Sequence, residues 1–183
     1  ELIAEPAKAA DANFIAFKNG VYDVAHEVMV PPSPDLILTN RIEHNFNPAA
    51  YSELMDSAPT KLACQDKDIR ALLEECVGYC FYRRNELGKA FILTGDKSNG
   101  KSTFLDVVAA ILGEDNISTL DIKELGDRFS TSMMFGKLAN IADDIGDDFL
   151  QGTQVSVFKK VVTGNRIKAE SKGQEVMRSE ERF

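Results

Sequence analysis

The motif Gly95–Thr103 constrains the fold of this chain more than any other feature. It reads GDKSNGKST and fits the spacing G-x-x-x-x-G-K-[ST]. The short apolar run Ala90–Thr94 precedes it, and apolar residues at helical spacing follow from Phe104 to Leu112. Gly113 stands where a helix C-cap is expected. A buried strand, a glycine-rich turn and a helix form a unit whose backbone amides can surround a phosphate group.

Each residue type in this motif has a physical role in holding a nucleotide. Gly95 and Gly100 permit backbone angles and close approach that a side chain would block. Lys101 is expected to reach the β- and γ-phosphates of ATP, and the Ser102 hydroxyl to ligate Mg²⁺. A structural glycine-rich turn is the alternative interpretation. The residues predicted to bind the nucleotide are Gly95, Asp96, Lys97, Ser98, Asn99, Gly100, Lys101, Ser102 and Thr103.

A second apolar run, Leu138–Ala142, predicts another strand and ends at two carboxylates, Asp143 and Asp144. Parallel strands bring their carboxyl ends to the edge of the sheet where the phosphate loop lies. Asp143 is therefore expected to bind Mg²⁺ through water, and Asp144 to act catalytically, with Lys101, by orienting or deprotonating the attacking water. The alternative is a pair of loop acids that cap a strand. Asp147 and Asp148 are expected to be solvated or to cap the next helix.

The order of elements after residue 88 predicts an α/β fold with a parallel-sheet core of the P-loop NTPase type, incomplete at its C-terminal side. A further helix is expected over Val155–Val162, with Gly164 as its stop. We place a domain boundary near residues 83–89. Residues 89–183 are then the N-terminal portion of an ATPase domain, and residues 1–88 an accessory domain that precedes it.

The accessory domain is predicted to be a small, mainly helical α+β unit. The segment Phe14–Asp23 predicts a hairpin around Asn19-Gly20, because both central residues of the favoured turn take positive φ. Residues 31–60 hold five prolines, which predict mostly loop with short elements. Apolar residues from Ile69 to Phe81 recur at helical spacing, with Cys76 and Cys80 on the apolar face. We interpret these two as buried structural thiols rather than metal ligands.

Charge is unevenly distributed along the chain. The net charge of −8 argues against a general nucleic-acid coat protein. Residues 155–178 nevertheless form a basic island, which is a candidate contact for phosphates. The segment from Lys159 to Lys172 can form an exposed hairpin that follows a single strand, with an affinity that falls as salt rises. A surface hairpin with ordinary solvating lysines is the equally open alternative.

Composition excludes several classes of protein. With 3 Cys and 2 His, a disulfide framework or a four-ligand zinc site is not expected. No apolar run approaches the roughly 20 residues of a membrane helix, and no signal peptide is visible, so we expect a cytoplasmic protein with no membrane contact. The chain starts at Glu1 and stops at Phe183, and we expect it to be a piece of a longer protein.

Three segments in this order, GDKSNGKST, GKLANIADDI and FKKVVTGNRIKAESKG, resemble the superfamily 3 helicase domain of phage and plasmid primase–helicases. The upstream FKNGVYDV is similar to the domain that precedes the motor in those proteins. The resemblance implies an AAA+-like ATPase that forms a hexameric ring and moves along single-stranded DNA. It maps the Walker A motif onto Gly95–Thr103 and the Walker B acids onto Asp143 and Asp144. It also maps a DNA-contacting hairpin onto the segment from Lys159 to Lys172, with Lys159, Lys168 and Lys172 as the contacts it implies. Asn165 stands where the family more often shows Asp.

The family's sensor Asn and arginine finger have no match before Phe183, and no primase centre is visible. Because a ring motor needs the finger from a neighbouring subunit, we expect the piece alone to bind nucleotide but to hydrolyse it poorly. The expected partners are single-stranded DNA, further copies of the protein, and other replication proteins through residues 1–88. Two other functions stay open: a non-catalytic nucleotide-binding module for assembly or recruitment, and a P-loop kinase acting on a small molecule.

Overall fold

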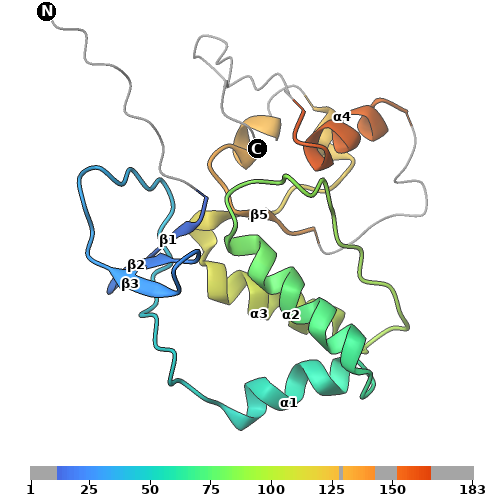
Figure 1. The fold of residues 1–183 in the computed structure, drawn as a ribbon. Coiled ribbons are helices and arrows are strands. Elements are labelled where there is room, and N and C mark those ends of the chain that lie inside the picture. Colours follow the sequence, from blue (N-terminus) through green and yellow to red (C-terminus); the bar gives the residue numbers. More distant parts are fainter. Residues whose placement is uncertain (1–11, 128–129, 143–151, 166–183) are drawn as a thin grey trace, which may run out of the picture.

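The computed structural model of the chain describes residues 12–127, 130–142 and 152–165. Within these ranges the protein is a mixed α/β structure with one antiparallel sheet, one parallel strand pair and four α-helices (Figure 1). Short 3₁₀ turns at residues 114–116, 124–126 and 130–134 connect the later elements. None of the helices in the described ranges is long and apolar enough to cross a membrane.

The N-terminal sheet is a meander of three antiparallel strands, β1 (Phe14–Phe17), β2 (Gly20–Asp23) and β3 (Val28–Val30). The predicted hairpin is confirmed, but its turn lies one residue earlier than expected. Phe17 pairs with Gly20, so Lys18 and Asn19 form the turn, and Asn19 does not take positive φ. The Asn19 amide instead donates to the carbonyl of Phe46 and accepts from its N–H, at 3.0 and 2.9 Å. A tertiary contact therefore overrides the local preference for an Asn-Gly turn.

Residues 31–52 are mostly loop, as the prolines predict, and helix α1 (Glu53–Leu62) is a short element whose type the sequence did not specify. Ser52 caps the helix by accepting a hydrogen bond from the N–H of Met55. Pro59 sits inside the helix and gives up one intrahelical bond. Helix α2 (Lys67–Phe81) follows as predicted, and Asp66 caps it by accepting from the N–H groups of Asp68 and Ile69.

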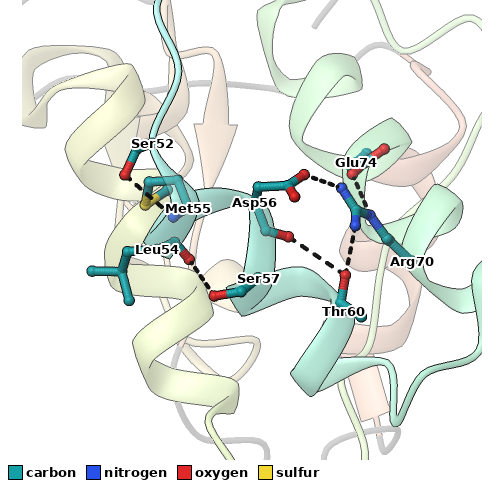
Figure 2. Close-up of polar contacts among 8 residues, drawn as sticks. All are labelled: Ser52, Leu54, Met55, Asp56, Ser57, Thr60, Arg70 and Glu74. Atoms are coloured by element: carbon teal, nitrogen blue, oxygen red, sulfur yellow. Dashed lines mark hydrogen bonds and ion pairs between the residues drawn. The ribbon is translucent and has the colours of Figure 1, made fainter.

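One arginine joins the first two helices. Figure 2 shows Arg70 of α2 donating to Asp56 Oδ1 and Thr60 Oγ1 of α1, each at 2.6 Å, and to Glu74 Oε1 at 2.9 Å. The hydrogen bonds to Asp56 and then to Glu74 raise the pKa of Arg70. This bridge provides a physical reason for a helix that tolerates Pro59.

The P-loop segment leads into helix α3 (Lys101–Leu112), which ends at Gly113 with φ +86° as expected. Two short strands, β4 (Ile117–Ser118) and β5 (Ala139–Asn140), pair in parallel. The predicted strand over residues 138–142 is thus present in shortened form. Helix α4 (Gly152–Val162) also agrees with the prediction, and the chain turns after it at Gly164 with φ +64°.

The expected strand over residues 90–94 is not formed, and this prediction needs correction. The segment pairs with no other strand of the described residues, and Phe91 and Ile92 are exposed. An apolar run forms a buried strand only where neighbouring strands pair with it and other elements cover both faces of the sheet. A full P-loop core is therefore not demonstrated, although β4 and β5 supply one parallel pair.

The hydrophobic core is shared by residues on both sides of the predicted boundary near 83–89. Its centre is Ile42, 2% exposed, with Val108 and Leu112 of α3, the latter fully buried. Partly buried side chains from β1, α2 and the parallel strand pair pack around these three: Ile15, Phe17, Val77, Cys80, Phe81, Phe104, Ile117, Leu138, Ala139 and Ile141. Figure 1 shows α2 lying along α3 beside the N-terminal sheet. The two-domain organisation itself stays a prediction.

Candidate functional site

The candidate site is the loop that leads into α3. Its two motif glycines, Gly95 and Gly100, have φ of +151° and +91°, and Ser98 between them has φ +58°. A Cβ atom on Gly95 would collide with the side-chain amide of Asn99, and one on Gly100 would lie 3.3 Å from Leu62 Cδ1 of α1. Both positions therefore favour glycine by their backbone angle, and a side chain at either one would also displace the flexible end of a neighbouring side chain. Leu62, the last residue of α1, therefore lies beside the phosphate loop at Gly100.

The N-terminus of α3 is open to an anion. Gly100 is the N-cap residue, no side chain makes a capping hydrogen bond there, and no acidic residue lies in the first turn. The first amides of a helix have no intrahelical acceptor, and the helix dipole makes this end positive. Residues 95–99 are exposed, and Gly100 and Lys101 are half-buried. An anion can therefore approach these amides directly from solvent.

Lys101 is the first residue of α3, and its ammonium group turns back into the loop. Lys101 Nζ donates to the carbonyl oxygen of Gly95 at 2.9 Å, to that of Asp96 at 2.7 Å, and to Asn99 Oδ1 at 2.9 Å. These three acceptors match the three hydrogens of an ammonium group. None of these three acceptors is a carboxylate, so among the described residues the charge of Lys101 lies beside the helix N-terminus without an ion pair.

The remaining predicted nucleotide-binding residues lie around this lysine. Asp96, Lys97 and Ser98 form the exposed part of the loop, and Ser102 and Thr103 occupy the exposed first turn of α3. Asp143 and Asp144 lie outside the described residues, so their proposed roles stay predictions. Among the described residues, no cluster of three or more His, Cys, Asp or Glu side chains could hold a metal ion.

Asn140 of β5 is a structural residue that the sequence analysis did not single out. Its Oδ1 accepts from the Leu120 N–H at 2.9 Å and from Ser118 Oγ at 2.8 Å, and its Nδ2 donates to the Leu120 carbonyl at 2.9 Å. This amide fixes the chain after β4 against β5. The signal was a single Asn within an otherwise apolar run, which a buried strand keeps only when the amide is paired.

The basic segment is described only at its start. Lys159 and Lys160 are exposed in the last turn of α4, where positive charge is favourable at a helix C-terminus. Thr163 Oγ1 donates to the carbonyl of Lys159, and the Asn165 N–H donates to that of Lys160. Lys168 and Lys172 lie outside the described residues. The DNA-contacting hairpin therefore stays a prediction.

Helix α4 is also tied to the segment that follows α2. Asn85 Nδ2 donates to the carbonyl of Val162 at 2.7 Å, and Tyr79 donates to Asn85 Oδ1 at 2.6 Å. This pair connects α2 to the end of the helix that carries Lys159 and Lys160. No local sequence pattern points to Asn85, because one of its partners, the Val162 carbonyl, lies 77 residues away along the chain.

The two cysteines on α2 agree with a packing role. Burial raises the pKa of Cys80 to about 11, and burial also raises that of Cys76. Both thiols are therefore protonated at neutral pH and are poor metal ligands or nucleophiles. Cys80 Sγ donates to the carbonyl of Cys76 within the same helix.

Comparison with known families gives two matches. Residues 5–78 match the family model described as "D5 N terminal like", and residues 93–182 match the one described as "Family of unknown function (DUF5906)". No curated protein matches the chain.

Proposed function

We propose that this chain is the ATP-dependent helicase or translocase portion of a phage or plasmid replication protein. The observation that carries the proposal is the placement of Lys101 in a glycine loop at the uncapped N-terminus of α3. The match to the D5 N terminal like domain, which is found in phage and plasmid primase–helicases, associates residues 5–78 with such proteins.

The donor set of the loop fits Mg-ATP. The open amides of α3 and the ammonium of Lys101 suit the β- and γ-phosphates. The Ser102 hydroxyl stands one residue further along the same helix turn, and hydroxyl and carboxylate oxygens are the ligands that Mg²⁺ prefers. In the proposal, Asp143 holds the water shell of the ion, and Asp144 takes a proton from the attacking water.

DNA contact is assigned to the basic segment. The exposed Lys159 lies at the end of α4, and Lys168 and Lys172 follow in the sequence. In a chain of net charge −8, these clustered lysines offer positive charge that DNA phosphates attract. In the proposal the active form is a hexameric ring around single-stranded DNA, and residues 1–88 contact other replication proteins.

The test is ATP binding and turnover with and without single-stranded DNA. Lys101→Ala is the active-site variant, and Lys89→Ala, at an exposed lysine just before the loop, is the matched control. Binding in the parent chain and the control, its loss in Lys101→Ala, and turnover that rises with DNA would support the proposal. Turnover that ignores DNA would overturn it in favour of a small-molecule kinase.

A non-catalytic assembly module is the second candidate, and an exposed apolar side chain favours it. Leu54 of α1 is 72% exposed, and Figure 2 shows it directed away from Arg70 and Glu74. Tyr51 and Met55, close to Leu54 in the sequence, are also exposed, and a group of exposed apolar side chains, unlike a single one, is typical of a partner surface. ATP binding without turnover, together with loss of self-association in Leu54→Glu, would favour this function over the motor.

A further inference from the structure

We propose that Asn99 is a positioning residue that holds Lys101 in the nucleotide-free loop and is displaced by phosphate. This inference rests on the proposed function, because it concerns how the same loop accepts its ligand. It assigns to Asn99 a role opposite to that of a phosphate contact: Asn99 stabilises the empty site.

The ammonium group of Lys101 has no hydrogen left for a ligand. Its three donors are taken by the carbonyls of Gly95 and Asp96 and by Asn99 Oδ1, at 2.7–2.9 Å. A phosphate oxygen can accept from Lys101 only if one of these acceptors leaves. Binding is therefore an exchange of acceptors rather than a simple addition.

Asn99 is the acceptor that costs least to release. The carbonyls of Gly95 and Asp96 belong to the backbone, so moving them means reshaping the loop. The oxygen of Asn99 is on an exposed side chain with two rotatable bonds, and water can solvate it after release. The structure therefore points to Asn99 Oδ1 as the atom that a phosphate oxygen replaces.

The side chain of Asn99 also lies across the start of the loop. Its amide nitrogen is so close to Gly95 that a Cβ atom there would collide with it. Gly95 thus makes room for the Asn99 side chain, in addition to its positive φ. With the amide nitrogen of Asn99 beside Gly95, its Oδ1 accepts the hydrogen bond from Lys101.

The sign of the effect follows from this arrangement. Asn99 contributes its hydrogen bond to the empty state and not to the bound state, so removing it destabilises only the empty state. Asn99→Ala should therefore bind phosphate ligands about three- to tenfold more tightly, as expected for one exposed hydrogen bond to a charged group. Asn99→Asp should bind at least about tenfold more weakly, because a carboxylate pairs with Lys101 and repels phosphate.

The experiment titrates the full chain with Mg-ATP and, separately, with tripolyphosphate, by calorimetry and by stopped-flow association. Asn47→Ala is the matched control, because Asn47 is also exposed and accepts one backbone hydrogen bond, from the Ala49 N–H. The proposal expects a tighter Kd and a faster association for Asn99→Ala with both ligands, and no change for Asn47→Ala. Where turnover is measurable, KM should fall and kcat should stay.

Three results would overturn the proposal in distinguishable ways. Weaker binding by Asn99→Ala would make Asn99 a direct phosphate contact, and unchanged binding would show that its bond to Lys101 contributes nothing. In both cases the parent chain still binds ATP, and the proposed function stands. If neither the parent chain nor Asn99→Ala binds ATP or tripolyphosphate, the proposed function and the role of Asn99 fall together.

Discussion

The buried side-chain amide of Asn116 connects two distant segments, so its substitution tests how much these hydrogen bonds stabilise the fold. Asn116 is 5% exposed, and its Nδ2 donates to the carbonyls of Leu112 and Arg41, each at 2.8 Å. Its Oδ1 accepts from Asn40 Nδ2 at 3.2 Å. One side chain thus joins the end of α3 to the segment that precedes α1. We predict that Asn116→Ala destabilises the fold by about 2–4 kcal/mol.

The magnitude follows from the groups that lose a partner. The Leu112 carbonyl is one of the last four of α3, which have no intrahelical donor, and Leu112 is fully buried. Leaving such a carbonyl unpaired costs about 1–3 kcal/mol, and the bond to the more exposed Arg41 carbonyl adds about 1 kcal/mol. This loss is a large share of the free energy of unfolding, which is typically about 5–15 kcal/mol for a domain.

The assay is urea unfolding followed by circular dichroism at 222 nm, since the chain has no tryptophan. With an m-value of about 2 kcal/mol/M, the midpoint should fall by about 1–2 M at unchanged slope. Asn47→Ala, at an exposed asparagine, should lose less than about 1 kcal/mol. A change below about 0.5 kcal/mol in Asn116→Ala would refute the argument that this amide satisfies a buried carbonyl.

A second variant gives the argument a pH signature. In Asn116→Asp the carboxyl group faces carbonyl oxygens in a buried site, so its protonated form is favoured and its folded-state pKa rises. Its stability relative to the parent chain is therefore best below the unfolded-state pKa of about 3.9 and falls as pH rises through the folded-state value. Equal destabilisation at pH 4 and pH 8 would show that the site is open to water.

Three further predictions concern other contacts. Arg70→Leu removes the bridge between α1 and α2, so the amides of residues 53–62 should exchange with deuterium faster than in the parent chain, while those of α3 keep their rates. The hydrogen bond from His26 holds the pKa of Asp23 below 3.8, so carbon NMR should still show an ionised Asp23 carboxylate just below pH 3.8. The contribution of this carboxylate to stability is present above pH 3.8 and is lost as pH falls through the folded-state pKa. At pH 8 the exposed Cys64 should react with iodoacetamide at once, whereas Cys80, with a pKa of about 11, should react only on unfolding.

Helices were predictable from the sequence wherever a local pattern decides them. The period of apolar residues from Ile69 to Phe81 and from Phe104 to Leu112 is a property of each segment alone, and α2 and α3 follow it. Helix α1 was missed because its prolines outweighed the Ser52 cap, and the contacts of Arg70 come from a different segment. Prediction from local sequence patterns therefore fails where contacts with a distant segment stabilise the conformation.

In the strands and the phosphate loop, too, the local sequence predicts residue roles but not the contacts with distant partners. The run at residues 90–94 carries strand composition, but a strand exists only where a partner pairs with it, and the sequence does not specify the partner. In the loop, the residue types of the motif predict that Lys101 faces a phosphate cradle. The hydrogen bond from Lys101 to Asn99 could not be predicted in this way. It goes with the positive φ of Ser98 and the space beside Gly95, and the spacing of the motif specifies neither.

The contacts across residue 88 determine how the proposed motor can be dissected. Ile42 lies in the same core as Leu112, Leu62 lies beside the phosphate loop at Gly100, and Asn85 binds the end of α4. Removing residues 1–88 would therefore expose apolar surface of α3 and change both the candidate nucleotide site and the start of the basic segment. A loss of activity in such a truncation could not be assigned to recruitment. Point substitutions on the exposed side of α1, such as Leu54→Glu, leave these three contacts in place, and they can separate a role in assembly from a role in the ATP site.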